Sequence, residues 1–224
     1  MSQRDKLSGT LIMSEKEFWN LIDQAQEACG KDQNSACQFL QDMLVEMGPD
    51  YAQDFHDIVH AYEELSDKFG LWSAAGMMGH DSDDSFIDFR AWLISQGREA
   101  YYGALRNPDS LAELDPGDGH WFESFTYIGD KALKSMTGRS AYHCTDQDAY
   151  GRLLNELKAG IQYWEGIDYP FASEELPEYF PHLYEQYPDK GASWLLTNPI
   201  IQAAREAGPP PRPVQETDLE LGGM

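Results

Sequence analysis

The chain has 224 residues, of which 42% are hydrophobic and 12% aromatic, and this composition argues against an intrinsically disordered protein. No segment reaches the roughly 18 consecutive apolar residues that a membrane-spanning helix requires. The formal net charge of −23 opposes binding to phosphate backbones, so we expect neither a nucleic acid nor a membrane as partner.

The negative charge is unevenly distributed along the chain. The stretch from Asp32 to Asp67 contains nine acidic side chains and neither lysine nor arginine. One interpretation is solubility; the other is a surface shaped for a basic partner protein, whose encounter such a surface accelerates.

Cysteine content and the N-terminus bear on the compartment. Cys29, Cys37 and Cys144 are odd in number and lack a C-x-x-C spacing, which favours reduced thiols in a cytoplasmic protein. The N-terminus has no apolar core or cleavage site of a secretion signal, and we expect residues 1–13 to be flexible.

Helical periodicity dominates the first half of the chain. Ser14 and Glu17 have the spacing of a capping box, and they precede a helix that ends at Gly30. A second helix is expected over residues 33–47, where Gly48 and a following proline stop it. A third is expected over about residues 49–69, followed by a short helix at 71–78 that is apolar on all sides and therefore buried.

The second half continues the same pattern. One helix is expected from residue 83 to about residue 96, and after a break at Gly97 another is expected to residue 106. A long helix is expected over 120–137, and a further one over 146–159. Residues 107–110 form a turn and a fresh helix start. Short helices are expected within 173–187 and 199–206.

These elements predict an all-α, irregular multi-helix globule with short connections and a Trp/Tyr/Pro-rich C-terminal extension. The expected organisation is a flexible N-terminus (1–13), a single helical domain (14–188), a helical extension (189–207) and a disordered, proline-rich acidic tail (208–224). Trp164 and Trp194 are candidates for lining a groove between the C-terminal third and the helical body.

An aspartate-rich run, GHDSDDSFIDFR, begins the helix after residue 82. On a helix Asp84 and Asp88 point away from the apolar face and Asp83 roughly toward it, so the carboxylates do not converge. We therefore interpret the run as a helix start, with Asp81 or Ser82 as N-cap and acids in the first turn. A calcium loop does not fit its spacing.

Arg90 lies within the apolar stripe of the same helix, where a guanidinium needs a carboxylate or carbonyl partner. Candidate partners are Asp83 and, from other helices, Glu123 and Asp130. The favoured interpretation is a buried contact that fixes helix packing. The alternative is an enzyme or small-molecule sensor whose binding residues would be Arg90, Asp83, Asp84, Trp72 and Arg98.

Several runs resemble the bacterial family called domain of unknown function 4240. They are LWSAAGMM (71–78), SDDSFIDFRAWLISQGRE (82–99) and NPDSL (107–111), with supporting likeness at 18–22, 131–138 and 181–187. The resemblance covers roughly residues 14–188. It implies a mainly helical intracellular domain without an established activity, and it assigns no role to His80, since MMGHD replaces the family's glycine-rich approach.

His56 and His60 have the i, i+4 spacing of the zinc motif H-E-x-x-H, with aspartate in place of the catalytic glutamate. A metal site would need a third ligand, for which His80 is a candidate. We favour surface histidines on an acid-rich helix, and we expect no metal and no other cofactor.

Taken together, the residues predict a non-enzymatic, acidic, cytoplasmic domain that binds a basic protein. An immunity-like or antitoxin-like role is one version of this hypothesis, because many toxins that attack nucleic acids are basic. The sequence predicts neither the partner's identity nor the oligomeric state.

Overall fold

The computed structural model describes residues 11–80, 82–115, 119–164 and 176–188, together with residues 199, 203 and 206. The predictions for residues 1–10, for most of 189–207, for the tail 208–224 and for Trp194 lie outside the described residues. Within them the secondary structure is helical and contains no strand, which confirms the all-α prediction. Each helix in this part of the chain is too short or too polar to cross a lipid bilayer.

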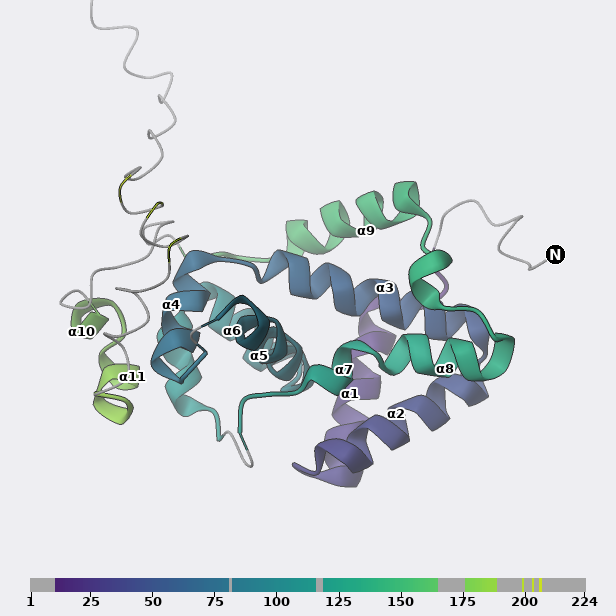
Figure 1. The fold of residues 1–224 in the computed structure, drawn as a ribbon, viewed down its shortest axis with the longest axis horizontal. Helices are drawn as coiled ribbons and strands as arrows, with labels where there is room; N and C mark the ends of the chain where they lie inside the picture. Colours follow the sequence, from purple (N-terminus) through teal and green to yellow (C-terminus); the bar gives the residue numbers. More distant parts are fainter. Residues whose placement is uncertain are drawn as a thin grey trace, which may run out of the picture.

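Apart from the longer connections at residues 114–122 and 161–175, the helices follow one another with short connections (Figure 1). In chain order they are α1 (Glu15–Cys29), α2 (Gln33–Met47), α3 (Pro49–Leu65), α4 (Phe69–Met77), α5 (Asp83–Ser95), α6 (Arg98–Arg106), the 3₁₀ helix η2 (Pro108–Glu113), α7 (Glu123–Thr126), α8 (Ile128–Thr137), the 3₁₀ helix η3 (Ala141–His143), α9 (Gln147–Gly160), α10 (Leu176–Tyr179) and α11 (Pro181–Gln186).

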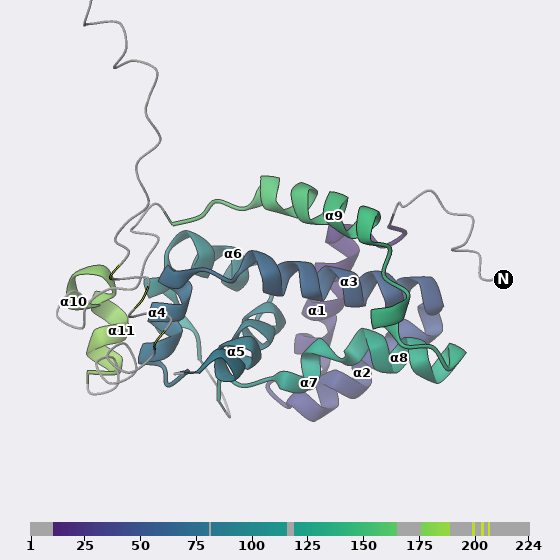
Figure 2. The same cartoon turned by 45° about the horizontal axis from the view of Figure 1, so that its top comes forward.

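Helix α3 is the central element of the fold. It packs against α2, α5, α8 and α9, and α9 runs along it in both Figure 1 and Figure 2. Helices α2 and α8 lie at one end of the molecule, and α10 and α11 lie beside α4 at the other. Because α3 is surrounded, even its polar side chains Asp54, Asp57 and Glu63 are buried and need hydrogen-bond partners.

Local capping signals located most helix ends correctly. Ser14 and Glu17 form the expected capping box, and Gly30 and Gly48 are the C-caps of α1 and α2. Ser82 is the N-cap of α5, where its hydroxyl accepts the backbone N–H of Ser85. These ends depend on residues within one turn of the helix, so the sequence alone could predict them.

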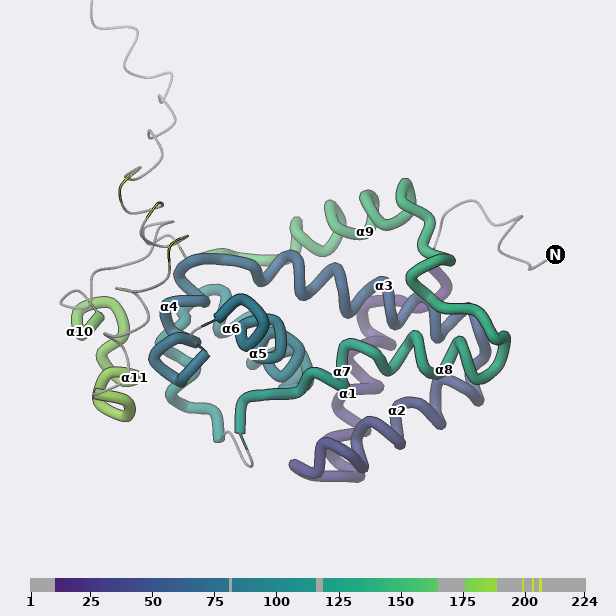
Figure 3. The backbone as a smooth tube through the Cα atoms, viewed as in Figure 1, coloured from purple at the N-terminus to yellow at the C-terminus, as the bar shows by residue number. Residues whose placement is uncertain are grey.

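Two expected helices were wrong in extent. The third ends at Leu65, where Ser66 is the C-cap and its hydroxyl donates to the carbonyl oxygens of Tyr62 (2.7 Å) and Glu63 (3.1 Å), and α4 begins at Phe69. Figure 3 shows the chain turning between α3 and α4. The long helix expected over 120–137 is divided at Tyr127 into α7 and α8.

Helices α3 and α8 approach closely at Gly129. A β-carbon at this glycine would lie 2.7 Å from the Ala52 carbonyl oxygen and 2.8 Å from both the backbone nitrogen and the β-carbon of His56. Two of these three atoms belong to the backbone of the central helix, which cannot move without disturbing its other contacts. The glycine therefore permits the α3–α8 crossing.

Substituting Gly129 with alanine is expected to lower the free energy of unfolding by about 1–3 kcal/mol, since overpacking forces the helices apart. Urea denaturation measures this loss. The control is Gly151→Ala on α9, where a β-carbon meets nothing within 4 Å and alanine should stabilise the helix by up to about 1 kcal/mol. Equal effects of the two substitutions would contradict the close crossing.

Candidate functional site

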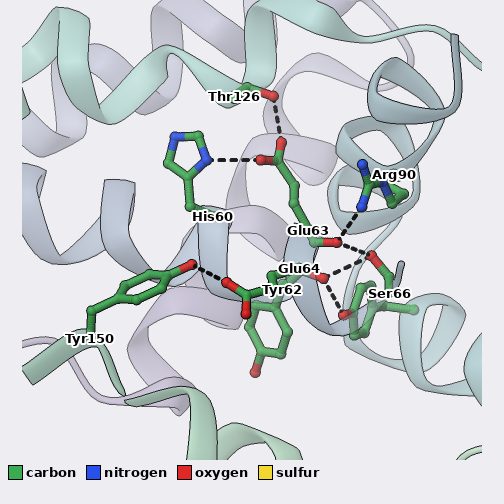
Figure 4. A network of polar contacts seen from close by, with 9 residues as sticks. His60, Tyr62, Glu63, Glu64, Ser66, Arg90, Thr126 and Tyr150 are labelled. Carbon is green, nitrogen blue, oxygen red and sulfur yellow. Dashed lines mark hydrogen bonds and ion pairs between the residues drawn. The ribbon is translucent and has the colours of Figure 1, made fainter. Parts of the chain in front are cut away.

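A chain of polar contacts connects the last turns of α3 to its neighbours (Figure 4). The carboxylate of Glu63 accepts a hydrogen bond from the Thr126 hydroxyl of α7 at 2.5 Å and lies 3.0 Å from Nδ1 of His60. The backbone carbonyl oxygen of the same residue accepts from the Arg90 guanidinium of α5 at 2.8 Å. One residue of the central helix thus holds two other helices.

Arg90 caps the C-terminal end of α3. Its side chain is only 12% exposed, its Nη1 lies 3.8 Å from the Asp67 carboxylate, and its guanidinium lies 4.9 Å from the centre of the Phe86 ring. A cation at this position is favoured by the partial negative charge of the helix end. Nε of Arg90 has no hydrogen-bond partner among the described residues.

The carboxylates that were expected to pair with Arg90 were wrong. Asp83 is an exposed residue of the first turn of α5, and Asp130 accepts from the hydroxyl of Ser140 and the amide of Ala141 instead. Glu123 lies near another acid, Asp88, whose pKa is raised by burial and by the negative charge of this glutamate. The guanidinium donates instead to a backbone carbonyl oxygen at the end of α3, which is the other kind of partner that the sequence led us to expect.

The other aspartates of the run behave as a helix start. Asp84, like Asp83, is exposed in the first turn of α5, where the helix dipole favours negative charge. Asp81 lies outside the described residues. The described positions therefore agree with the interpretation of this run as architecture.

Trp72 and Arg98 lie in different places. Trp72 is buried in α4 and stacks on Phe86 with ring centres 5.2 Å apart, so it shares with Arg90 the ring of Phe86. Arg98, at the start of α6, lies 3.4 Å from the Glu15 carboxylate and over the ring of Tyr102. The five candidate binding residues do not form one site.

The histidine pair was expected on the surface, and this prediction was wrong. His56 is 2% exposed, and its ring centre lies 4.3 Å from that of the partly buried His60. Burial is the main cause that lowers the pKa of His56 to about 3, with the neighbouring His60 adding to it. His80 is also buried, its Nδ1 lies 2.9 Å from the Ser85 carbonyl oxygen, and burial lowers its pKa to about 4.

Metal coordination finds no support in these histidines. Across the described ranges, no three or more His, Cys, Asp or Glu side chains are grouped so that they could hold a metal ion. The low pKa values instead mark neutral rings packed in the core, consistent with the T-shaped contact of His56 with the Tyr142 ring.

Two hollows open on the side of α1. The first has a volume of about 280 Å³ and lies where α1, α2, α5 and the start of α7 meet. Its apolar floor is formed by Ile22, Ala25, Leu40, Trp92, Phe122 and Phe125. Lys31 and Asp115 pair with each other at its rim, beside Asp32.

The second hollow, of about 590 Å³, lies between α1 and the junction of α5 with α6. It is lined mainly by polar groups, among them Glu15, Asp23, Arg98 and Glu99. Arg90, Asp83 and Asp84 line neither hollow, so these two hollows do not provide the pocket that the alternative interpretation needs.

Asp109 joins two of the runs that carried the family resemblance. It belongs to NPDSL, and its buried carboxylate accepts the backbone N–H groups of His182 (3.1 Å) and Leu183 (3.0 Å) at the start of α11. Nδ1 of His182 lies 2.6 Å from the same carboxylate. This contact attaches α11 to η2.

The Asp109 contact should make stability depend on pH. The hydrogen bond to Asp109, followed by its charge, raises the pKa of His182 above 6.5. Protonated His182 therefore stabilises the fold below pH 6.5, and this contribution is lost as the pH rises through the raised pKa. In urea denaturation, the difference in free energy of unfolding between the wild type and His182→Gln should become smaller as the pH rises. The same substitution at the exposed His143 is the control.

The chain belongs to the family DUF4240, described as a protein of unknown function, whose model matches residues 13–135. The match covers just over half of the chain and confirms the family resemblance; residues 136–188, including the run at 181–187, lie beyond it. A search of curated proteins found no match. A search of solved structures found none either.

Proposed function

We propose that this chain is a non-catalytic binding domain for a basic protein in a reducing, cytoplasmic compartment. The observation that carries the proposal is the net charge of −23. A negative field of this size attracts a cationic partner over a distance and repels nucleic acid and anionic lipid.

The structure refines where this charge lies. Of the nine acids between Asp32 and Asp67, Asp54, Asp57 and Glu63 are buried and hydrogen-bonded within the fold. The others remain at least partly open to solvent, and α2 and α3 carry no lysine or arginine to offset them. Part of the charge is therefore architectural, and the rest forms the surface that a basic partner would meet.

The cysteines support the proposed compartment. Cys29, Cys37 and Cys144 are all free thiols in the structure, and Cys37 is buried. Free, partly buried thiols suit a reducing environment. An immunity-like or antitoxin-like role against a basic toxin is the version of the proposal that we regard as most specific, since charge neutralisation of a nucleic-acid-binding surface would inhibit such a toxin directly.

The test is capture from an extract of the producing cells at low salt, identification of the bound protein, and titration with that purified protein at several salt concentrations. We expect a basic protein whose association rate falls as salt rises, because exposed charges are screened within about 10 Å at 0.1 M salt. An unrelated acidic protein of similar net charge, used as bait, controls for ion exchange. Failure to find a partner with salt-sensitive binding specific to this chain would overturn the proposal.

A further inference from the structure

The two hollows adjoin each other along α1, and together we call them the groove. Gln26 and Gln96 line both of them, and Gln26 donates from its side chain to the Ser95 carbonyl oxygen at 2.6 Å across their boundary. The lining residues on α1 run from Glu15 to Gly30, a length of about 22 Å at 1.5 Å per residue. An extended peptide of roughly seven residues has this length.

One end of the groove is apolar and preformed. The six floor residues belong to three long helices and the start of α7, and each is at most 4% exposed, so the floor is the hydrophobic core itself. The volume of this hollow, about 280 Å³, is close to the lower limit for ligand pockets. It has room for one large apolar side chain and parts of the adjacent residues of a peptide. Burial of a single aromatic or branched anchor in such a hollow is how many interfaces gain most of their affinity.

The other end of the groove is negative. The cations Arg98 and Lys31 already pair with Glu15 and Asp115, respectively. Asp23 and Glu99 are exposed. Apart from Arg98 and Lys31, Lys16 is the only cationic side chain among the lining residues that can offset their charge. The charge that a ligand meets on entering is thus of the same sign as that of the whole molecule.

We infer that this groove is the docking site for a basic polypeptide segment, which places one large apolar side chain in the first hollow and lysine or arginine side chains along the second. The inference rests on the proposed function and specifies its surface. A second copy of this chain is a poor occupant, because two molecules of charge −23 repel each other. A phosphate at the N-terminus of α2 is disfavoured as well, because the Asp32 carboxylate already accepts the amide of Ser35 there.

Selection from a phage-displayed library of random peptides tests the inference directly, because it does not require that the cellular partner be identified first. The wild-type protein is the bait, and the variant Ala36→Phe, in which a half-buried α2 residue lining the first hollow fills it, is the counter-selection. We expect enriched peptides that combine a large apolar residue with lysines or arginines, and that bind Ala36→Phe at least tenfold more weakly. Ala149→Phe, at a half-buried position of α9 outside the groove, should bind them as the wild type does.

A charge-reversal pair tests the other end of the groove in case the filled variant folds poorly. Asp23→Lys with Glu99→Lys should weaken the peptides at least tenfold, while Asp148→Lys with Glu156→Lys on α9 changes the net charge equally and should have little effect. Equal weakening by both pairs, or a library without groove-dependent peptides, overturns the inference. If a salt-sensitive partner from cells binds Ala36→Phe as tightly as wild type, the groove is wrong and the proposed function stands. If no such partner exists, the proposed function itself fails.

Discussion

Replacement of Asp54 by alanine is expected to lower the free energy of unfolding by about 2–3 kcal/mol. One oxygen of this fully buried α3 carboxylate accepts the backbone N–H groups of Ile12 at 2.6 Å and Met13 at 3.0 Å, and thereby holds the segment before α1. Alanine removes the acceptor from both amides. The buried Met13 amide is then an unsatisfied donor, which costs about 1–3 kcal/mol, whereas the partly buried Ile12 amide costs less because water can reach it. Urea denaturation monitored by tryptophan fluorescence gives the loss.

The substitution Asp54→Asn separates the acceptor from the charge. Its amide oxygen can occupy the position of the carboxylate oxygen and accept the same two N–H groups, so we expect it to retain more than half of the stability that alanine loses. If asparagine is as damaging as alanine, the negative charge near the N-terminal end of α3 matters more than the hydrogen bonds. A loss below about 1 kcal/mol in the alanine variant would show that the N-terminal segment contributes little.

The sequence predicted what depends on neighbours in the chain. The capping box of Ser14 with Glu17 and the glycine C-caps are interactions within a few residues, and they appear in the structure where they were expected. The N-cap of α5 is Ser82, one of the two residues expected there. The end of α3 was missed because a serine is compatible with both the interior and the end of a helix, so Ser66 does not mark the C-cap by itself.

Burial of polar residues was harder to predict, because it depends on the whole arrangement of helices. His56 was expected at the surface of an acid-rich helix, but α8 crosses that face at Gly129 and covers it. Glu63 gave no sequence signal as the centre of a network, since its partners Thr126 and Arg90 are distant along the chain. The polar face of this helix thus predicted exposure to solvent, whereas in the fold these side chains are buried against other helices.

The groove was beyond the reach of sequence reasoning for the same reason. Trp92 and Phe125 have the periodicity of core residues, and both are buried in the core. The hollow above them arises because α1, α2 and α5 meet there, which depends on the tertiary arrangement. Arg98 was the one candidate binding residue that the structure places in the groove. Its position in the family block was the signal, but nothing in that block indicated α1 as the opposite wall.

The substitution Arg90→Met is expected to lower the free energy of unfolding by about 2 kcal/mol and to leave peptide binding in the groove unchanged. A hydrogen bond from a charged donor contributes about 1.5–3 kcal/mol and the contact with Phe86 about 0.5–1 kcal/mol, partly offset by relief of the buried Nε that lacks a partner. Methionine keeps the packing of the aliphatic stem, so the loss reports the guanidinium alone.

Arg90→Lys sharpens the same experiment. Lysine retains the charge near the end of α3 but not the planar group that reaches the Glu63 carbonyl oxygen while lying near the Phe86 ring, so its stability should fall between wild type and methionine. Urea denaturation of the three proteins gives this order, and titration with a selected peptide is the parallel measurement. If Arg90→Met kept full stability but lost peptide binding, the arginine would be a ligand-binding residue and the architectural interpretation of the aspartate-rich helix would fail. The structure argues for the opposite result, because this side chain ends on the backbone of the central helix and lines neither part of the groove.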